Sequence, residues 1–290
     1  MSNQHYQQFF DWVAASVPEA IALVEPMQIA PLAGDAGFRR YYRTNTVPSL
    51  VAVDSPPAKE NNSAYLNISH ALQSQMVRTP IIYAVNAEQG FMLLEDFGEQ
   101  LLLPALNQQS VDSLYGQAET CLLQIQQLLP NEQIFPSYNS ARLRDEMALF
   151  PQWFVGELLG SSLHQDETAM LERLFTCLVE NALQQPQVLV HRDYHSRNLM
   201  LLADGDMGVI DFQDAVWGPV TYDLVSLLKD CYIRWPATMV RQRALAFKQR
   251  LLTADPGLDI EDQQFLRWFD LMGLQRHIKV MGIFARLALR

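Results

Sequence analysis

Three side chains near residue 200 have the types and order that phosphoryl transfer requires. Asp193 and Asn198 lie in His-Arg-Asp-Tyr-His-Ser-Arg-Asn after an apolar run, and Asp211 follows in Ile-Asp-Phe. Transfer of a phosphoryl group from ATP needs positioning and charge cancellation more than covalent chemistry from the protein. A carboxylate beside the attacking hydroxyl can accept its proton, and amide and carboxylate oxygens can bind Mg²⁺. We therefore expect Asp193 to be the catalytic base and Asn198 and Asp211 to be magnesium ligands.

A strand, a tight loop and a hairpin must position these side chains. The apolar run 188–190 predicts a strand that leads into the loop, and the runs 199–202 and 207–210 predict a hairpin. The loop would place the Asp193 carboxylate and the Asn198 amide on one rigid turn. The hairpin would bring Asp211 back toward both of them. A lone His-x-Asp or Ile-Asp-Phe would mean little, because Asp at a strand end is common turn chemistry. The complete ordered set is hard to obtain by chance.

The rest of the chain divides into a β-rich part and a helical part. Before residue 97 we expect a small antiparallel sheet with helices at 4–16 and 62–75, the second capped by Asn61 or Asn62. Beyond Gly98 the pattern is mostly helical, with helices expected at 111–129 (capped by Ser110), at 142–159, at 167–183 and from 221 onward. The composition changes near 96–100, which predicts an N-terminal lobe of 1–97 and a C-terminal lobe of 98–290.

Composition and charge exclude several classes of protein. The chain has 290 residues, 49% of them hydrophobic, and a formal net charge of −11. This hydrophobic content excludes a disordered chain, and the acidic balance argues against nucleic acid or an anionic membrane as a partner. The three cysteines form no Cys-x-x-Cys pair, and neither a signal peptide nor a transmembrane segment is recognisable. We expect a cytoplasmic protein with a small-molecule substrate and no obligate protein partner.

The catalytic segment resembles that of the aminoglycoside phosphotransferase and choline kinase superfamily. His195 follows the base by two residues where protein kinases usually have Lys, and Trp217-Gly218-Pro219 precedes Asp223. The resemblance implies a bilobal protein-kinase-like α+β fold, with a small antiparallel β N-lobe and a larger helical C-lobe, that binds ATP and Mg²⁺. It also implies that His191 and Asp223 support the catalytic loop.

The segment 94–98, Leu-Glu-Asp-Phe-Gly, resembles the inter-lobe linker of that superfamily. In the superfamily the backbone of this linker holds adenine. Glu95 and Phe97 are therefore expected to bind the nucleotide.

Several longer segments resemble one bacterial subgroup, the anomeric N-acetylmuramate/N-acetylglucosamine 1-kinases of cell-wall recycling. These segments are GDAGFRRYYR, VAVDSPPAKEN, LLEDFG, RDEMALFPQWF, VHRDYHSRNLM, DFQDAVWGPVTYDLVSLLKDCY and LQRHIKVMGIFARL. The resemblance implies phosphorylation of the anomeric hydroxyl of these sugars, to give sugar 1-phosphates for peptidoglycan recycling. The alternatives are another small-molecule kinase of the superfamily, for an aminoglycoside, choline or homoserine, and a nucleotide-binding pseudokinase.

The phosphate-binding residues depart from the kinase pattern. Gly34 and Gly37 give two glycines where a kinase loop has three, and a plain β-turn explains them equally well. Asp54 stands where a kinase strand holds its phosphate-binding Lys, so the cation must come from elsewhere. Arg39 and Arg40 can fork onto phosphate oxygens, or lie on a solvated strand. Their substitutes would be Lys59 and Arg43, and Glu60 could orient the cation.

The acceptor site is predicted from residues around the helical lobe. Glu146 and Trp153 are seven residues apart, so one helix face could bind a sugar by hydrogen bonding and stacking, although core packing explains Trp153 as well. Gln213 and Asp214 follow the metal ligand and could reach sugar hydroxyls, or Asp214 could cap its loop.

A basic cluster is the last predicted feature of the acceptor site. Arg276, His277 and Lys279 are close in sequence in an otherwise acidic protein. They could meet the lactyl carboxylate of N-acetylmuramate, with a solvated helix face as the alternative.

Overall fold

The computed structural model describes residues 3–32 and 37–290 and divides into two compact units. The first unit contains Met1–Gln100 and Met200–Gln213, and the second contains Leu101–Leu199 and Asp214–Arg290. Each unit has its own buried apolar residues, and the two are described separately below.

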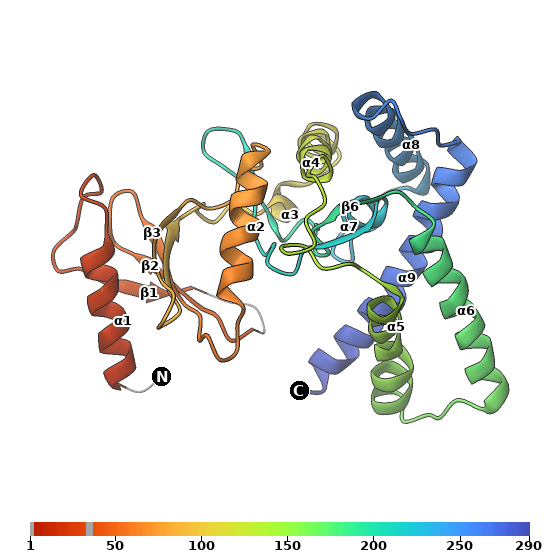
Figure 1. The fold of residues 1–290 in the computed structure, drawn as a ribbon, viewed down its shortest axis with the longest axis horizontal. Coiled ribbons are helices and arrows are strands. Elements are labelled where there is room, and N and C mark those ends of the chain that lie inside the picture. The colour runs from red at the N-terminus through yellow and green to blue at the C-terminus, as the bar shows by residue number, and fades with distance from the viewer. Residues whose placement is uncertain (1–2, 33–36) are drawn as a thin grey trace. The chain divides into compact units, whose positions relative to one another are not determined.

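The first unit is built on a five-stranded antiparallel sheet between two helices (Figure 1). The strand order is β1 (Ile29–Pro31), β2 (Arg40–Thr44), β3 (Leu50–Asp54), β5 (Phe91–Glu95) and β4 (Ile82–Asn86). Helix α1 (Asn3–Ser16) covers one face and α2 (Asn62–Ser74) stands on the other side. Side chains alternate between the faces of a strand. Leu50 and Leu93 accordingly pack with Phe9 of α1 in one buried cluster.

The hairpin after the catalytic loop also belongs to the first unit. Strand β7 (Leu199–Leu201) pairs with β8 (Met207–Val209), and the Val209 amide donates to the Arg78 carbonyl at 2.8 Å. A Cβ on Gly208 would lie 2.8 Å from the Phe97 ring, so only glycine allows this approach. The sequence placed all of 98–290 in one lobe. The structure differs for Met200–Gln213, because these contacts join the hairpin to the first unit.

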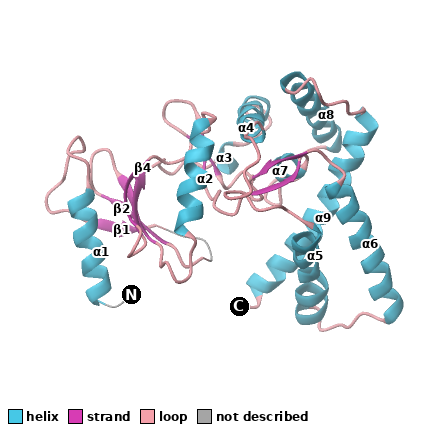
Figure 2. Ribbon diagram, viewed as in Figure 1, coloured by secondary structure: helices cyan, strands magenta, loops and turns pink. Residues whose placement is uncertain are grey.

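The second unit is mainly helical around a short two-stranded sheet (Figure 2). Strand β6 (Gln187–Val190) pairs antiparallel with β9 (Val216–Pro219). The helices are α3 (Leu102–Ala105), α4 (Val111–Gln126), α5 (Ser140–Leu149), the π-helix η1 (Phe150–Leu158), α6 (Gln165–Leu183), α7 (Tyr222–Leu228), α8 (Ala237–Ala254) and α9 (Asp262–Ala288). Helix α9 contacts α5, η1, α6, α7 and α8, and is thus the common partner of the unit.

Two helix predictions need correction. The predicted helix 142–159 is two segments, because Pro151 lacks an N–H and its ring disfavours continued α-helix; the wider π-helix η1 follows α5 instead. The spacing between Glu146 and Trp153 therefore no longer describes one α-helical face. Ser110 makes no side-chain cap bond to α4, because its hydroxyl donates to the Ala105 carbonyl. The cap on α2 is confirmed, with the Asn61 side chain accepting from the Ala64 amide.

Helix α9 packs closely against the end of α5 at Gly282. A Cβ there would lie 2.4 Å from the Leu149 carbonyl carbon, so Gly282→Ala should lower the free energy of unfolding by about 1–3 kcal/mol. Gly116 in α4 is the matched control, because a Cβ there meets nothing within 4 Å. Gly116→Ala should raise stability by about 0.5–1 kcal/mol, as expected for alanine inside a helix. Thermal unfolding of both variants measures the difference, and equal melting temperatures would contradict this packing.

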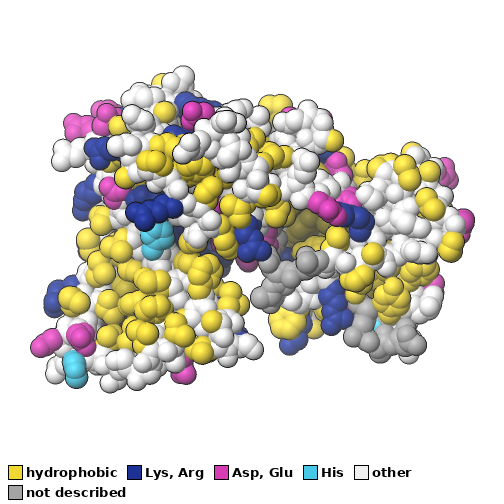
Figure 3. Space-filling view, turned by 180° about the vertical axis from the view of Figure 1, so that it is seen from behind, with side chains coloured by type: hydrophobic (Ala, Val, Ile, Leu, Met, Phe, Trp, Pro, Cys, Tyr) yellow, Lys and Arg dark blue, Asp and Glu magenta, His cyan; other side chains and the backbone are white. Residues whose placement is uncertain are grey.

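The surface of the second unit carries a broad area of apolar side chains on the face shown in Figure 3. Helix α9 exposes apolar side chains toward its end, including Met281, Phe284 and Leu287. Among residues 3–32 and 37–290, none of the helices combines the length and apolar character needed to span a bilayer.

Candidate active site

The loop that follows β6 is fixed by one buried carboxylate. Asp223, at the start of α7, accepts hydrogen bonds from the backbone amides of His191 at 2.6 Å and Arg192 at 3.0 Å. Burial raises the pKa of Asp223 to about 7, against the two backbone donors and the Arg276 guanidinium. Arg192 has a φ of 77°, a conformation that non-glycine residues rarely adopt. The loop is therefore held in a specific, strained conformation.

Asp193 lies half-buried within this loop, and its backbone anchors the next turn. Its carbonyl accepts from the His195 amide at 2.9 Å and from Asn198 Nδ2 at 3.0 Å. Burial alone would raise the pKa of the Asp193 carboxyl, but the cations of Lys279, Arg276 and Arg192 hold it below its ordinary value. The side chain is therefore a carboxylate at neutral pH, as a proton acceptor must be.

A network of buried charges lies behind the loop. The Arg192 guanidinium pairs with the Glu146 carboxylate, which also accepts from the Tyr138 hydroxyl. Lys279 Nζ lies 3.3 Å from Glu146 Oε1 and donates to the Tyr222 hydroxyl at 3.1 Å. Burial would raise the pKa of Glu146, but Lys279 and Arg192 bring it below the ordinary value. Glu146, predicted as a sugar ligand, thus has protein partners on both carboxylate oxygens.

The predicted basic cluster separates in the structure. Arg276 and Lys279 are 6% and 5% exposed, so the alternative of a solvated helix face is wrong for both. Arg276 donates to the Arg192 carbonyl at 2.8 Å, whereas His277 is exposed and lies 3.3 Å from the Lys229 carbonyl. Trp153 lies apart from these residues, with the Arg290 guanidinium over its ring.

Asn198 and Asp211 are the expected magnesium ligands. The hydrogen bond to Asp193 orients the Asn198 amide. Asp211 has a φ of 63° and accepts from Gln213 Nε2 at 2.6 Å, while the Asp214 carbonyl accepts from Arg192 at 3.4 Å. An amide and a carboxylate oxygen suit Mg²⁺, which takes few protein ligands. The described residues contain no group of three or more acidic, His or Cys side chains that could hold a metal ion.

Arg39 is a cation that the first unit buries near Asp211. Its guanidinium lies 3.2 Å from Glu60 Oε2, 3.2 Å from Ser55 Oγ and over the Tyr65 ring. Tyr65 in turn stacks on Phe212, the residue after Asp211. The solvated-strand alternative is therefore wrong for Arg39.

The other residues predicted around the phosphates have different surroundings. Arg40 is exposed, Lys59 lies over the Phe38 ring, and Arg43 pairs with Asp96. Asp54 turns to His5 of α1, with 3.1 Å between Oδ1 and Nε2. Gly37 is exposed with Glu60 nearby, and Gly34 lies outside the described residues.

The segment resembling a nucleotide-binding linker is fastened by two arginines. Arg78 forms a two-pronged pair with Glu95 at 2.6 and 2.8 Å and lies over the Phe97 ring. Arg43 binds Asp96 at 2.6 and 3.1 Å, and this pairing lowers the pKa of Asp96 although burial opposes it. Because the side chains of this segment are anchored, its backbone is held in one position.

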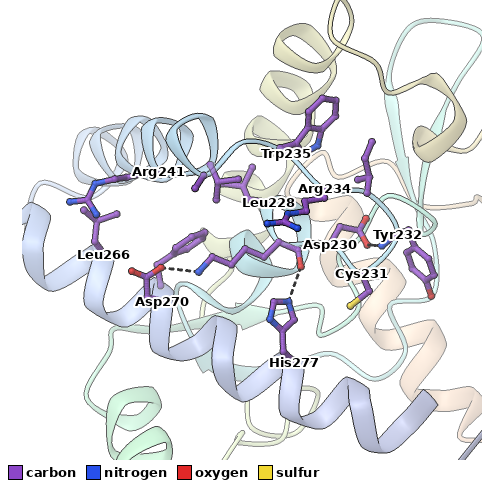
Figure 4. Close-up of a pocket in the computed structure, with 15 residues that line it drawn as sticks. Leu228, Asp230, Cys231, Tyr232, Arg234, Trp235, Arg241, Leu266, Asp270 and His277 are labelled. Atoms are coloured by element: carbon purple, nitrogen blue, oxygen red, sulfur yellow. Dashed lines mark hydrogen bonds and ion pairs between the residues drawn. The ribbon is translucent and has the colours of Figure 1, made fainter. Parts of the chain in front are cut away.

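A cavity of about 660 Å³ in the second unit borders the catalytic loop (Figure 4). Its lining includes Tyr232, Arg234, Trp235, Arg241, Phe269 and His277. Asp230 joins the wall to the loop by accepting from the Ser196 amide at 3.0 Å, and His195 and Arg197 contact the Tyr232 ring. Of the predicted acceptor residues, His277 alone lines it. The other lining residues were not predicted from the sequence, although Tyr232, Arg234 and Trp235 between α7 and α8 could have pointed to them.

Comparisons with known proteins show the family of this chain. Residues 28–259 match the phosphotransferase enzyme family. The chain belongs to that family. A Pseudomonas putida protein named N-acetylmuramate/N-acetylglucosamine kinase is 44% identical over 257 residues, covering 88% of this chain and 75% of the relative. A Pseudomonas aeruginosa protein of the same name is 39% identical over 294 residues, covering 99% and 86%.

The fold of this phosphotransferase matches solved structures of small-molecule kinases. The GDP complex of wild-type aminoglycoside 2'-phosphotransferase-IIIa superposes with a TM-score of 0.63 at 17% identity, over 99% of this chain and 93% of the other. The predicted kinase-like α+β fold and family are thereby confirmed. The roles of individual site residues remain predictions.

Proposed function

We propose that this phosphotransferase uses ATP and Mg²⁺ to phosphorylate the anomeric hydroxyl of N-acetylmuramate and N-acetylglucosamine. The observation that carries the proposal is the 44% and 39% identity, over most of the chain, to two relatives named as kinases of these sugars. The products would be ADP and sugar 1-phosphates for peptidoglycan recycling. The enzyme would act in the cytoplasm, where ATP is available.

Asp193 is the proposed base in this reaction. Its carboxylate, kept ionised by nearby cations, accepts the proton of the anomeric hydroxyl as the hydroxyl oxygen attacks the γ-phosphorus. The new oxygen–phosphorus bond forms as the bond between the γ-phosphorus and the ADP oxygen breaks. Asn198 and Asp211 are the proposed ligands of Mg²⁺, which supplies positive charge to the phosphate oxygens.

Arg39 is the proposed replacement for the lysine that a kinase strand uses to bind phosphate. The Glu60 carboxylate and Ser55 hydroxyl hold its guanidinium as an acidic side chain of a kinase holds the lysine. A guanidinium can bind two phosphate oxygens at once. With Arg39 in this role, the chain would not lack the phosphate-binding cation whose absence suggested a pseudokinase.

Arg39→Met should raise the KM for ATP and lower kcat. Loss of charge-assisted hydrogen bonds worth about 1.5–3 kcal/mol predicts a fall in kcat/KM for ATP of roughly 10- to 150-fold. Steady-state kinetics with ATP as the varied substrate measure it. Arg40 is the matched comparison, because it is adjacent and exposed. An effect of Arg40→Met equal to or larger than that of Arg39→Met would remove Arg39 from this role.

The cavity beside the catalytic loop is the proposed site of the acceptor sugar. Tyr232 and Trp235 offer flat apolar surfaces for a sugar ring, and Arg234, Arg241 and His277 offer positive charge. N-acetylmuramate differs from N-acetylglucosamine by a lactyl carboxylate, which such cations can bind. Because Asp230 joins the cavity wall to the loop by a hydrogen bond, a sugar bound in the cavity would have a fixed position relative to Asp193.

Arg234→Gln should weaken the binding of N-acetylmuramate more than the binding of N-acetylglucosamine. A lost ion pair at this exposed position is worth up to about 1 kcal/mol, which predicts a rise in KM for N-acetylmuramate of roughly 2- to 5-fold and a smaller change for N-acetylglucosamine. The two KM values, measured at saturating ATP, give the comparison. Equal changes for both sugars would argue against a carboxylate at this position.

An acceptor panel tests the proposed function directly. ADP formation is measured with Mg²⁺ and N-acetylmuramate, N-acetylglucosamine, glucose, choline, homoserine or kanamycin. We expect turnover on the two N-acetyl sugars, with the phosphate on C1 by ³¹P NMR. Turnover on another acceptor alone would retain the kinase and discard the sugar assignment. ATP binding without turnover on any acceptor would favour the pseudokinase.

A further inference from the structure

Helix α9 places two cations in the interior of the second unit, directed at the catalytic loop. Arg276 donates to the carbonyl of Arg192, the residue before Asp193, and its guanidinium lies 4.7 Å from the centre of the Tyr222 ring. One turn further, Lys279 reaches Glu146 and Tyr222. Both side chains are almost fully buried. The last helix thus contacts the catalytic loop directly through Arg276 and contacts the partners of that loop through Lys279.

Stability alone does not explain these buried charges. Removing ions from water is expensive, and a buried ion pair is often no more stabilising than apolar side chains of similar volume. The contacts converge instead on Arg192, whose carbonyl is bound by Arg276 and whose guanidinium is bound by Glu146. A strained backbone such as that of Arg192, with its φ of 77°, persists only where its surroundings over-determine it.

We propose that Lys279 and Arg276 of α9, together with Glu146 of α5, are positioning residues that hold Arg192 and thereby set the place of Asp193 against the acceptor hydroxyl. Lys279 acts through Glu146, and Glu146 acts through Arg192. The inference rests on the proposed role of Asp193 as the base. None of the three side chains needs to touch substrate, which separates their role from the sugar-binding role predicted for Glu146 and Arg276 from the sequence.

The first test compares two buried lysines. Lys279→Met should lower kcat by about 10- to 100-fold, because small misplacements of reacting groups have effects of that size. The KM for ATP and the KM for the acceptor sugar should each change by less than about twofold. Lys279→Arg should recover most of kcat. Lys248 is the matched control: its side chain is 5% exposed against 7% for Lys279, and it binds Asp262 and the Ile260 carbonyl instead of the loop network. Lys248→Met should lower the melting temperature and retain kcat.

A charge-balanced double variant and a second measurement distinguish a local effect on the loop from misfolding of the protein. Lys279→Met with Glu146→Gln removes both members of the pair, so kcat should fall less than the product of the two single losses. Amide hydrogen exchange of residues 190–199 should accelerate in Lys279→Met and stay unchanged in Lys248→Met.

The outcomes separate the inference from the proposed function. Unchanged kcat and loop exchange in Lys279→Met, or parallel losses in Lys248→Met, would overturn the inference while sugar turnover by the unaltered enzyme still supports the function. If the unaltered enzyme turned over no acceptor, the proposed function would fail. Amide hydrogen exchange of residues 190–199 would then be the test of whether Lys279 holds the loop.

Discussion

Asp193→Asn should lower kcat by about 10²- to 10⁴-fold while ATP still binds, because asparagine keeps the shape of the side chain but cannot accept the acceptor proton. Two features suit Asp193 to this step: the position of its backbone is fixed, and its side chain is ionised. Its backbone is anchored by His195 and Asn198, and nearby cations lower its pKa. Single-turnover rates with N-acetylmuramate measure the chemical step, and ATP affinity is measured separately by titration calorimetry.

The control for this prediction is the folded state of the variant. The Asp193 backbone bonds do not involve its carboxylate and should persist, but Lys279, Arg276 and Arg192 lose a nearby negative charge, so we expect a folded variant with a modestly lower melting temperature. Retention of more than a tenth of the rate would exclude Asp193 as the base. A matching loss of ATP affinity would indicate a binding role instead.

Asp211→Asn should reduce turnover more than about a hundredfold, because even partners in the outer sphere of a metal site contribute about 10- to 100-fold. The loss should appear as a requirement for much higher Mg²⁺. Activity measured against Mg²⁺ concentration at fixed ATP tests it, with Mn²⁺ as a second ion.

Asp204 provides a matched carboxylate in the same hairpin. It is exposed in the turn between β7 and β8, where it accepts from the Asp206 amide. Asp204→Asn should leave the Mg²⁺ dependence unchanged. The same dependence in Asp211→Asn as in the unaltered enzyme would remove Asp211 from the metal site.

The sequence predicted the catalytic loop well because its chemistry is local. Asp193, Asn198 and the strand before them lie within about ten residues, so spacing alone relates them. The antiparallel sheet before residue 97 was predictable for the same reason, since short β-prone runs separated by turn residues mark its strands. The family was recognised from these short segments, and the comparisons confirm it.

The sequence did not predict contacts between distant residues. Arg192 and Glu146 are 46 residues apart, and Arg276 and Arg192 are 84 apart, so no local pattern joins them. Three basic residues within four positions of a helix suggested one cluster. Helical geometry instead sends Arg276 and Lys279 inward and His277 toward the cavity. The cavity was missed because it joins the segment 228–241 to one side of α9.

The discontinuous makeup of the first unit has a consequence for its synthesis. Residues 1–100 leave the ribosome long before the hairpin of Met200–Gln213 is made, so the nascent N-terminal segment lacks the partner of Arg78 and Phe97. Folding of this unit must therefore finish after most of the second unit has been translated. Until the hairpin is made, the unpaired surface of the N-terminal segment can aggregate or bind chaperones. Expression of 1–100 alone is accordingly expected to give an incomplete domain.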